Sequence, residues 1–326
     1  MKNIILTLDY ELFLNQSGTI KNCILNPVSA LSNTLDKHAI KAVFFIDILY
    51  LHRLKTENLS EEFKLVKNDV QNLIRNGHQI ELHLHPHWID AKYDSESSAW
   101  DLSNYTNYRL HALDKQQLEN VFNIGYELLL EIGKEVDNQF SLNAFRAGGL
   151  CIQPFSKIKP LLLKHDIRID SSVAPTFSSD SKTHFYNFVN APLLDQYSFS
   201  DDPCLQDNSG EFKEFPVLHY KKSFFHKVLS KIKGGVNTSN KIFGDGKAAS
   251  PQFKGSNSIL NKFKSDKYLF SLDGDYDEPL LLKKIKSEKN PTITILSHPK
   301  LMSPQSLKTI DKLVQAGYKF NQMTTH

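Results

Sequence analysis

Short apolar runs alternate with longer amphipathic segments along this chain. The runs at residues 4–8 and 42–46 are typical of strands that are buried on both faces of a parallel sheet. After Asp114, a suitable helix N-cap, apolar residues recur at helical spacing. These predicted core positions are Leu118, Val121, Phe122, Gly125, Leu128, Leu129 and Ile132.

The remaining elements continue the alternation. Helices are predicted at residues 26–37, 60–76, 154–165 and 304–316, and further strands at 144–146, 167–170 and 292–297. Repeated strand–helix units indicate a parallel sheet covered by helices. The predicted fold class is therefore α/β.

Three histidines follow one predicted strand. Residues 79–84 form an apolar approach to His83, His85 and His87, and Pro86 separates the last two. Because side chains alternate along a strand, His83 and His85 share a face, and the proline lets His87 turn back toward them. Neutral imidazole is a common ligand of zinc and related ions. The alternative is a solvated loop, but the apolar approach indicates a buried strand end.

A second apolar strand ends in two acids. Asp9 and Glu11 stand at alternate positions after residues 4–8, so both would face the same way. Such a pair can also simply be solvated at a strand edge. Together with three histidines, however, two carboxylates make a mixed oxygen and nitrogen site for a divalent metal, and they leave one carboxylate for acid–base chemistry.

Five short motifs extend this pattern over most of the chain. In chain order they are Thr7-Leu8-Asp9-Tyr10-Glu11, Gly77-His78-Gln79-Ile80 leading to His83 and His87, Phe145-Arg146-Ala147-Gly148-Gly149, Ile169-Asp170-Ser171-Ser172 and Leu296-Ser297-His298-Pro299. The set resembles the polysaccharide deacetylase family with the NodB homology fold. The resemblance implies one catalytic domain over residues 1–326, in which about seven parallel strands close into an irregular (β/α) barrel with the site at their carboxyl ends.

The resemblance also implies a metal site. His83 and His87, which are separated by three residues, would hold the metal with one acid of the first motif, and His85 would line the site. A pairing of His83 with His85 on the strand stays open as the alternative. The expected cofactor is a divalent metal, zinc in the first place, with cobalt, nickel and manganese as alternatives.

The chain departs from the family pattern at Tyr10. The common first motif has two adjacent aspartates, and Tyr10 stands in the second position, where a phenol is a poor ligand for such a metal. We therefore assign Glu11 as the metal ligand and Asp9 as the general base. The alternatives are the reverse assignment and a metal-free site in which the histidines polarise the substrate.

The other motifs imply the remaining catalytic residues. Arg146 would orient the base Asp9 through a charge-assisted contact. His298 would be the general acid, and Asp170 would pair with it and keep it protonated. A proton donor is needed because an amine anion is a very poor leaving group. The glycines at residues 148–149 would allow close backbone approach at this point.

Two segments exceed what a bare barrel needs, at about residues 89–113 and 176–290. The first is polar and carries scattered aromatic residues such as Trp100, Tyr105 and Tyr108. Aromatic rings in such a loop either stack on sugars above the site or pack on the rim of the barrel.

Charge and cysteine content indicate which partners and which cellular compartment to expect. The formal net charge of +3 over 326 residues is too small to indicate a nucleic-acid partner. Cys23, Cys151 and Cys204 are odd in number and far apart, which favours a reducing compartment over a disulfide framework. The apolar run before Asp9 is too short for a signal peptide, and no run reaches the length of a membrane span. We expect a cytoplasmic protein.

The predicted activity follows from these assignments. We expect a metal-dependent hydrolase that removes an acetyl group from an N-acetylated sugar or glycan precursor during surface-glycan assembly. One alternative is a hydrolase of another linear amide on the same fold. Another is a catalytically inactive glycan-binding protein, which the departure at Tyr10 favours. A separate base and acid argue against the binding protein, which has no use for them.

Overall fold

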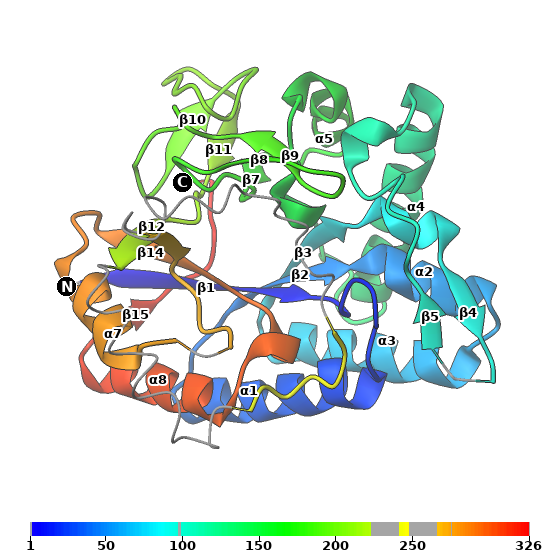
Figure 1. Cartoon of the computed structure of the whole chain (residues 1–326), viewed down its shortest axis with the longest axis horizontal. Coiled ribbons are helices and arrows are strands. Elements are labelled where there is room, and N and C mark those ends of the chain that lie inside the picture. The colour runs from blue at the N-terminus through cyan, green and yellow to red at the C-terminus, as the bar shows by residue number, and fades with distance from the viewer. Residues whose placement is uncertain (1, 97–98, 223–240, 248–265, 275, 326) are drawn as a thin grey trace, which may run out of the picture.

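A nine-stranded sheet forms the centre of the computed structural model (Figure 1). Its strands run in the order β10 (Tyr197–Phe199), β11 (Phe212–Glu214), β7 (Ile169–Asp170), β6 (Ala144–Ala147), β3 (Gln79–Leu84), β2 (Val43–Asp47), β1 (Asn3–Tyr10) and β14 (Thr292–Ser297), and β15 (Lys319–Phe320) also pairs with β1. The structure describes residues 2–96, 99–222, 241–247, 266–274 and 276–325.

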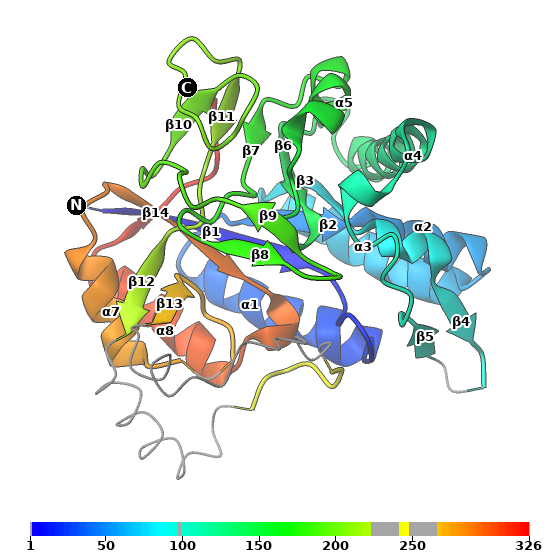
Figure 2. The same cartoon turned by 45° about the horizontal axis from the view of Figure 1, so that its top comes forward.

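The sheet is mostly parallel and strongly curled. Among its described strand pairs, only β10 and β11 run antiparallel. Figure 2 shows β7, β10 and β11 at a steep angle to β1. A bridge between Val217 and Thr294 joins the segment after β11 to β14, so the sheet curls back toward its other edge. The α/β class and the irregular, barrel-like parallel sheet expected from the sequence are confirmed.

Helices cover the outside of the curled sheet (Figure 1). They are α1 (Asn26–Lys37), α2 (Ile48–Thr56), α3 (Ser60–Arg75), α4 (Lys115–Lys134), α5 (Lys159–Lys164), α7 (Glu278–Ser287) and α8 (Pro304–Gln315). The predicted start at Asp114 is confirmed, because its side chain and that of Gln117 form a capping box. The helix predicted at residues 154–165 is shorter. A 3₁₀ turn occupies Phe155–Lys157, and Pro160, which lacks an N–H, fits only the first turn of a helix.

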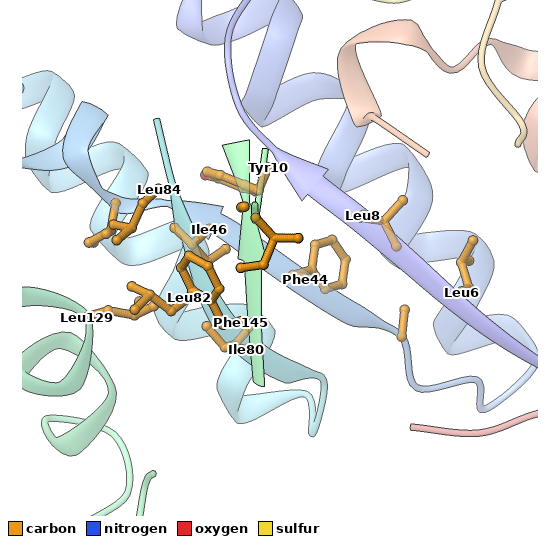
Figure 3. Close-up of a cluster of buried hydrophobic side chains, with 14 of the residues drawn as sticks. Leu6, Leu8, Tyr10, Phe44, Ile46, Ile80, Leu82, Leu84, Leu129 and Phe145 are labelled. Atoms are coloured by element: carbon orange, nitrogen blue, oxygen red, sulfur yellow. The ribbon is translucent and has the colours of Figure 1, made fainter. Parts of the chain in front are cut away.

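Strand alternation sorts the core into two layers. Leu8, Phe44, Leu82 and Phe145 belong to the layer between sheet and helices, where Figure 3 shows them with Leu129 of α4. Burial of each such side chain contributes roughly 1.5–3 kcal/mol. The opposite strand positions face the inside of the curl and form a second cluster: Ile5, Val43, Phe45, Ala144, Ile169, Phe215 and Met323. Coverage on both faces explains why these strands read as continuous apolar runs.

The two segments predicted as insertions carry small hairpins. β4 (Lys92–Asp94) pairs with β5 (Ala99–Asp101) in the first, and β8 (Ser178–Asp180) with β9 (Phe185–Asn187) in the second. The second also holds the pair β12 (His219–Lys222) and β13 (Asp266–Leu269), and it supplies β10 and β11 to the central sheet. Residues 223–240 and 248–265 lie outside the described residues. Within the described ranges, no helix is both long and apolar enough to cross a membrane.

Candidate metal and catalytic site

The predicted site residues lie at the carboxyl ends of neighbouring parallel strands. Asp9 lies in β1, His83 in β3 and Arg146 in β6, and His298 directly follows β14. The first three occupy strand positions of the same parity as the inner cluster, so their side chains point into the curl. Parallel strands bring their carboxyl ends to one edge, which gathers residues that are far apart in the sequence.

Glu11, His83 and His85 bring three ligand atoms together, all within 4.8 Å of one another. Glu11 Oε2 lies 2.5 Å from His85 Nε2 and 3.3 Å from His83 Nε2. His83 Nδ1 donates to the Arg146 carbonyl oxygen at 2.8 Å, which leaves the Nε2 lone pair facing the group. Two imidazole nitrogens and one carboxylate oxygen are a donor set that suits zinc and similar divalent ions.

His87 does not join this group, which differs from the ligand pair implied by the family motif. Strand alternation continues through His85, and Pro86 then begins a 3₁₀ helix (Pro86–Asp90) that carries His87 away. Its ring stacks on Tyr108 with centroids 5.4 Å apart. Burial and the nearby charge of His85 hold the pKa of His87 well below its usual value, so its imidazole is neutral.

Gly148 makes room for His85. A Cβ at this position would lie 2.6 Å from the Leu84 carbonyl oxygen and 2.7 Å from His85 Nδ1, closer than real Cβ atoms approach. Any side chain there would push the imidazole out of its place. The next residue, Gly149, has φ +59°, and its Cβ would meet the Tyr108 ring at 2.8 Å. Both glycines therefore permit close approach of neighbouring side chains, His85 to Gly148 and Tyr108 to Gly149.

Asp9 is held from one side by a buried arginine. Arg146 Nη1 donates to Asp9 Oδ1 at 2.6 Å, and the other guanidinium N–H groups bind Thr7 and Ser171. Burial alone would raise the pKa of Asp9, but Arg146, His83 and His298 outweigh it and lower the pKa. The second oxygen, Oδ2, faces the site, 3.9 Å from His83 Nε2 and 3.7 Å from His298 Nε2. The predicted contact between Arg146 and Asp9 is present.

His298 is paired with Asp273, not with Asp170 as expected. Its Nδ1 lies 2.6 Å from Asp273 Oδ2, and its backbone N–H donates to Asp273 Oδ1 at 2.8 Å. Burial would lower the pKa of His298, but Asp273, Glu11 and Asp9 outweigh it and raise the pKa to about 9. His298 Nε2 faces the site, 3.6 Å from Glu11 Oε1.

Asp170 lies deeper in the sheet and contacts other groups. Its carboxylate accepts hydrogen bonds from the Ser172 hydroxyl at 2.7 Å and the Ser172 backbone N–H at 3.2 Å. Glu214 lies opposite it on β11. Burial raises the pKa of both acids, and the negative charge of Asp170 raises the pKa of Glu214 further, well above its usual value. The structure therefore places this pair in the sheet interior, where burial favours the neutral form of each acid.

Lys300 completes the surroundings of Glu11. Its Nζ donates to Glu11 Oε1 at 2.8 Å and to the Leu12 carbonyl oxygen at 2.5 Å. Burial would raise the pKa of Glu11, but Lys300, His85 and His83 outweigh it and hold the pKa well below its usual value. Glu11 is therefore an anion throughout the neutral range, as a metal carboxylate must be.

The site opens into two adjoining cavities. The smaller, about 260 Å³, is lined by Asp9, Glu11, His85 and His298 and also by Tyr108, Leu150 and His184. The larger, about 1200 Å³, shares Glu11, His85 and His298 and extends below the turn between β8 and β9. In Figure 2, this hairpin lies across the carboxyl end of β1.

The aromatic residues of the first predicted insertion have two kinds of surroundings. Tyr105 and Tyr108 line the larger cavity. Trp100 is buried and packs instead against Trp88 and Tyr50, with ring centroids 5.3 and 6.3 Å apart. The segment therefore supplies both a cavity wall and a packed rim.

Sequence reasoning missed three residues of the site. Asp273 contacts the predicted acid His298, Lys300 contacts the predicted metal ligand Glu11, and His184 lines both cavities. Lys300 stands two positions after His298, but it lies in the 3₁₀ turn Pro299–Leu301, so strand alternation does not place it. Asp273 and His184 lie in loops without a local pattern, so only the folded chain places them.

The fold is similar over nearly its whole length to solved structures of polysaccharide deacetylases and related carbohydrate esterases. A Mycobacterium smegmatis protein provisionally assigned as a polysaccharide deacetylase is 12% identical, with a TM-score of 0.49, and the match covers 98% of this chain and 87% of that one. A family 4 carbohydrate esterase from Streptomyces lividans, in complex with acetate, is 9% identical, with a TM-score of 0.43 and coverage of 99% and 93%.

A further similar structure is a family 4 pseudoenzyme from Bacillus anthracis. It is 10% identical, with a TM-score of 0.43, and the match covers 99% of this chain and 64% of that one. No protein-family model and no curated protein matches the sequence. At these identities the similarity concerns the fold alone.

Proposed function

We propose that this protein is a metal-dependent hydrolase that removes an acetyl group from an N-acetylated sugar or glycan precursor. One observation carries the proposal: two titratable groups with opposite pKa shifts face each other beside a candidate metal group. The pKa of Asp9 is lowered and that of His298 is raised to about 9, so near pH 7 the first is a carboxylate and the second an imidazolium. A charged base and a charged acid in one site suit hydrolysis of an amide.

Glu11, His83 and His85 would hold the metal, because their donor atoms converge and Glu11 stays ionised. When bound, a divalent metal acts as a Lewis acid toward a carbonyl oxygen and makes water more acidic. Zinc is the first candidate, and cobalt, nickel and manganese are the alternatives, because all accept imidazole and carboxylate ligands.

Asp9 would take the proton of the attacking water. Its Oδ1 is occupied by Arg146, which leaves Oδ2 as the oxygen that faces the site. The arginine fixes the carboxylate in place and keeps it ionised in a buried position. Asp9 is thus oriented before the substrate arrives, which is what a general base needs.

His298 would give its proton to the leaving nitrogen. Its Nδ1 is held by Asp273, so Nε2 is the N–H that faces the site. With a pKa of about 9, the imidazolium stays protonated at neutral pH until the amine begins to leave. A general acid of this kind contributes on the order of a hundred-fold or more to the rate.

The size and lining of the larger cavity support a glycan substrate. Its volume of about 1200 Å³ exceeds the roughly 300–1000 Å³ of pockets for drug-sized ligands. Tyr105, Tyr108 and Tyr186 line it and offer ring faces on which sugars stack. The proposed substrate is therefore an acetylated oligosaccharide or a carrier-linked sugar. As part of the same proposal the reaction takes place in the cytoplasm, which the free cysteines Cys23, Cys151 and Cys204 support.

Acetate release tests the proposal. The purified protein is stripped of metal and reloaded with zinc, cobalt, nickel or manganese. It is then incubated with N-acetylglucosamine and N-acetylgalactosamine oligomers of increasing length. We expect acetate release from the loaded protein only, with rates that rise with oligomer length, and loss of release in His83→Ala.

Two other results would contradict the proposal in different ways. Glycan binding without acetate release under every metal would identify an inactive binding protein. Release of formate or ammonia from simple linear amides, with no acetate from the glycans, would identify the alternative amide hydrolase.

A further inference from the structure

Lys300 is a buried cation at the edge of the candidate metal group. Only 4% of its surface is exposed, and it lies in the 3₁₀ turn Pro299–Leu301 directly after His298. A buried ammonium group is costly unless it is paired and hydrogen-bonded. Lys300 meets this condition through Glu11 and the Leu12 carbonyl oxygen, and its Nζ also lies 5.1 Å from the Phe13 ring centroid.

The two carboxylate oxygens of Glu11 have different partners, because Lys300 engages only one of them. Oε1 accepts from Lys300 Nζ at 2.8 Å, whereas Oε2 faces His85 Nε2 at 2.5 Å and His83 Nε2 at 3.3 Å. An ionised carboxylate can otherwise accept on both oxygens and rotate about its terminal bond. The Leu12 carbonyl fixes Nζ from the other side, so the lysine is itself held in place.

We propose that Lys300 is a positioning residue of the metal site: it engages Oε1 of Glu11 so that Oε2 alone is presented to the metal, beside His83 and His85. This inference rests on the proposed function, because it presumes that the three residues bind a metal. Groups that orient metal ligands in this way typically account for 10–100-fold in metal affinity. Lys300 does not enter any of the five motifs on which the family resemblance depends.

Metal binding alone tests the inference without a substrate. Zinc affinity is measured by competition with a chromophoric chelator at one pH, and Co²⁺ binding is followed by visible absorption, which reports the number and arrangement of ligands. Lys300→Met keeps the aliphatic stem and removes the ammonium group. We expect it to bind zinc about 10–100-fold more weakly than the wild type and to change the Co²⁺ spectrum.

Lys222→Met is the matched control. Lys222 is also buried, at 8% exposed, and it contacts an aromatic ring, that of Tyr268, but it lines neither cavity. We expect its zinc affinity and Co²⁺ spectrum to equal those of the wild type. If Lys300→Met does not fold, Lys300→Gln replaces it, because glutamine keeps a neutral N–H donor. The expected change then has the same direction and a smaller size.

A double-mutant cycle shows whether Lys300 acts through Glu11. In the Glu11→Gln background, Lys300→Met should cause little further loss of zinc affinity, because the oxygen that the lysine positions is already altered. An undiminished loss in that background would overturn the inference. So would unchanged or tighter zinc binding by Lys300→Met alone.

Failure of the proposed metal site has a different signature. In that case the wild type itself binds no zinc, or His83→Ala binds it as tightly as the wild type. Either result would rule out both the metal site and the role of Lys300. If His83→Ala weakens zinc binding and Lys300→Met does not, only the role of Lys300 is ruled out.

Discussion

Asp9 and His298 owe their opposite pKa shifts to different partners. Arg146 stabilises the carboxylate of Asp9 across the inside of the curled sheet. Asp273 stabilises the imidazolium of His298 from a loop beside β14. The pKa of each group is thus shifted by a residue that does not line the cavities. The atoms that face the cavity, Oδ2 and Nε2, remain free for proton transfer.

The base can be tested by a near-isosteric change. Asp9→Asn keeps an oxygen that accepts from Arg146 but cannot take a proton from water. We expect unchanged zinc content, because Asp9 is outside the group of ligand atoms, and a loss of acetate release of about 10²–10⁴-fold. Zinc analysis and an acetate assay check both parts. Loss of zinc in this variant, with Glu11→Gln keeping its metal, would exchange the two roles.

The acid can be tested through the pH dependence of the rate. His298 must be protonated, so we expect kcat/KM to fall as the pH rises through about 9. Asp273→Asn removes the charge that holds the proton on His298. The pKa then falls toward its usual range, and the alkaline limb of the profile moves to lower pH.

Asp170→Asn is the control for that shift. Asp170 contacts Ser172 and Glu214 and has no described contact with His298. The alkaline limb should therefore stay in place in Asp170→Asn, whatever happens to the overall rate. A shift in Asp170→Asn without one in Asp273→Asn would restore the pairing expected from the sequence.

At the scale of elements, the end of β3 decides which histidines meet Glu11. Strand alternation predicts that His83 and His85 share a face, and the structure brings these two together. The family spacing instead favoured His87, which the 3₁₀ helix after Pro86 places against Tyr108 and Trp88. The period of the strand agrees with the group of converging donor atoms, and the motif spacing stays a prediction that metal binding must test.

Two alanine variants distinguish these assignments. His85→Ala should lose most of the bound zinc and with it acetate release. His87→Ala should keep zinc, because its ring is not among the converging ligands, and should lose activity only as far as the wall of the larger cavity is disturbed. Metal analysis of the two purified proteins is sufficient. The reverse result would mean that metal binding rearranges the loop after β3.

The sequence predicted what depends on local pattern and missed what depends on the folded chain. Continuous apolar runs located β1 and β2, and Asp114 located the start of α4. The helix α2 was missed, because it begins directly after β2 and its first residues are apolar like the strand. Five of its residues are buried: Ile48, Leu49, Tyr50, Leu51 and Leu54. Asp273 was missed because the loop that carries it has no repeating pattern, and its contact with His298 exists only in three dimensions.

At the scale of the whole molecule, the pair of acids between β7 and β11 affects stability. Both Asp170 and Glu214 are buried, and the pKa of Glu214 lies well above its usual value of 4.5. Because the pKa of Glu214 is raised in the folded state, the folded chain holds this proton up to a higher pH than the unfolded chain does. The free energy of unfolding therefore falls as the pH rises from about 4.5 through the folded-state pKa, because the unfolded state binds fewer protons there.

Replacing Glu214 should remove this dependence. Glu214→Gln can still accept from the Val173 backbone N–H and can donate to Asp170 without needing a proton from solution. We expect the variant to be more stable than the wild type at pH 8, by on the order of 1 kcal/mol or more, and to gain less at pH 5. Urea unfolding at the two pH values measures this. The control is Glu211→Gln, at an exposed position next to β11, which should show no difference in gain between the two pH values. Equal gains in stability at pH 5 and pH 8 for Glu214→Gln would argue against a proton held by the pair of acids.

The position of β1 in the sheet determines when the site can assemble during synthesis. β1 pairs with β14 along Asn3–Leu8 and with β15 at Asn3 and Ile4, and the hydroxyl of Thr7 donates to the carbonyl of Ile295, 288 positions away. On the ribosome, β1 with Asp9 is made before β14 and His298, and all other described strands of the central sheet except β15 are made between them. A nascent chain must therefore keep the edge of β1 that pairs with β14 uncovered until β14 has been made, and during that time chaperones and aggregation compete for it. The proposed base and acid meet only once β14 has been made, so a shorter nascent chain lacks the assembled pair.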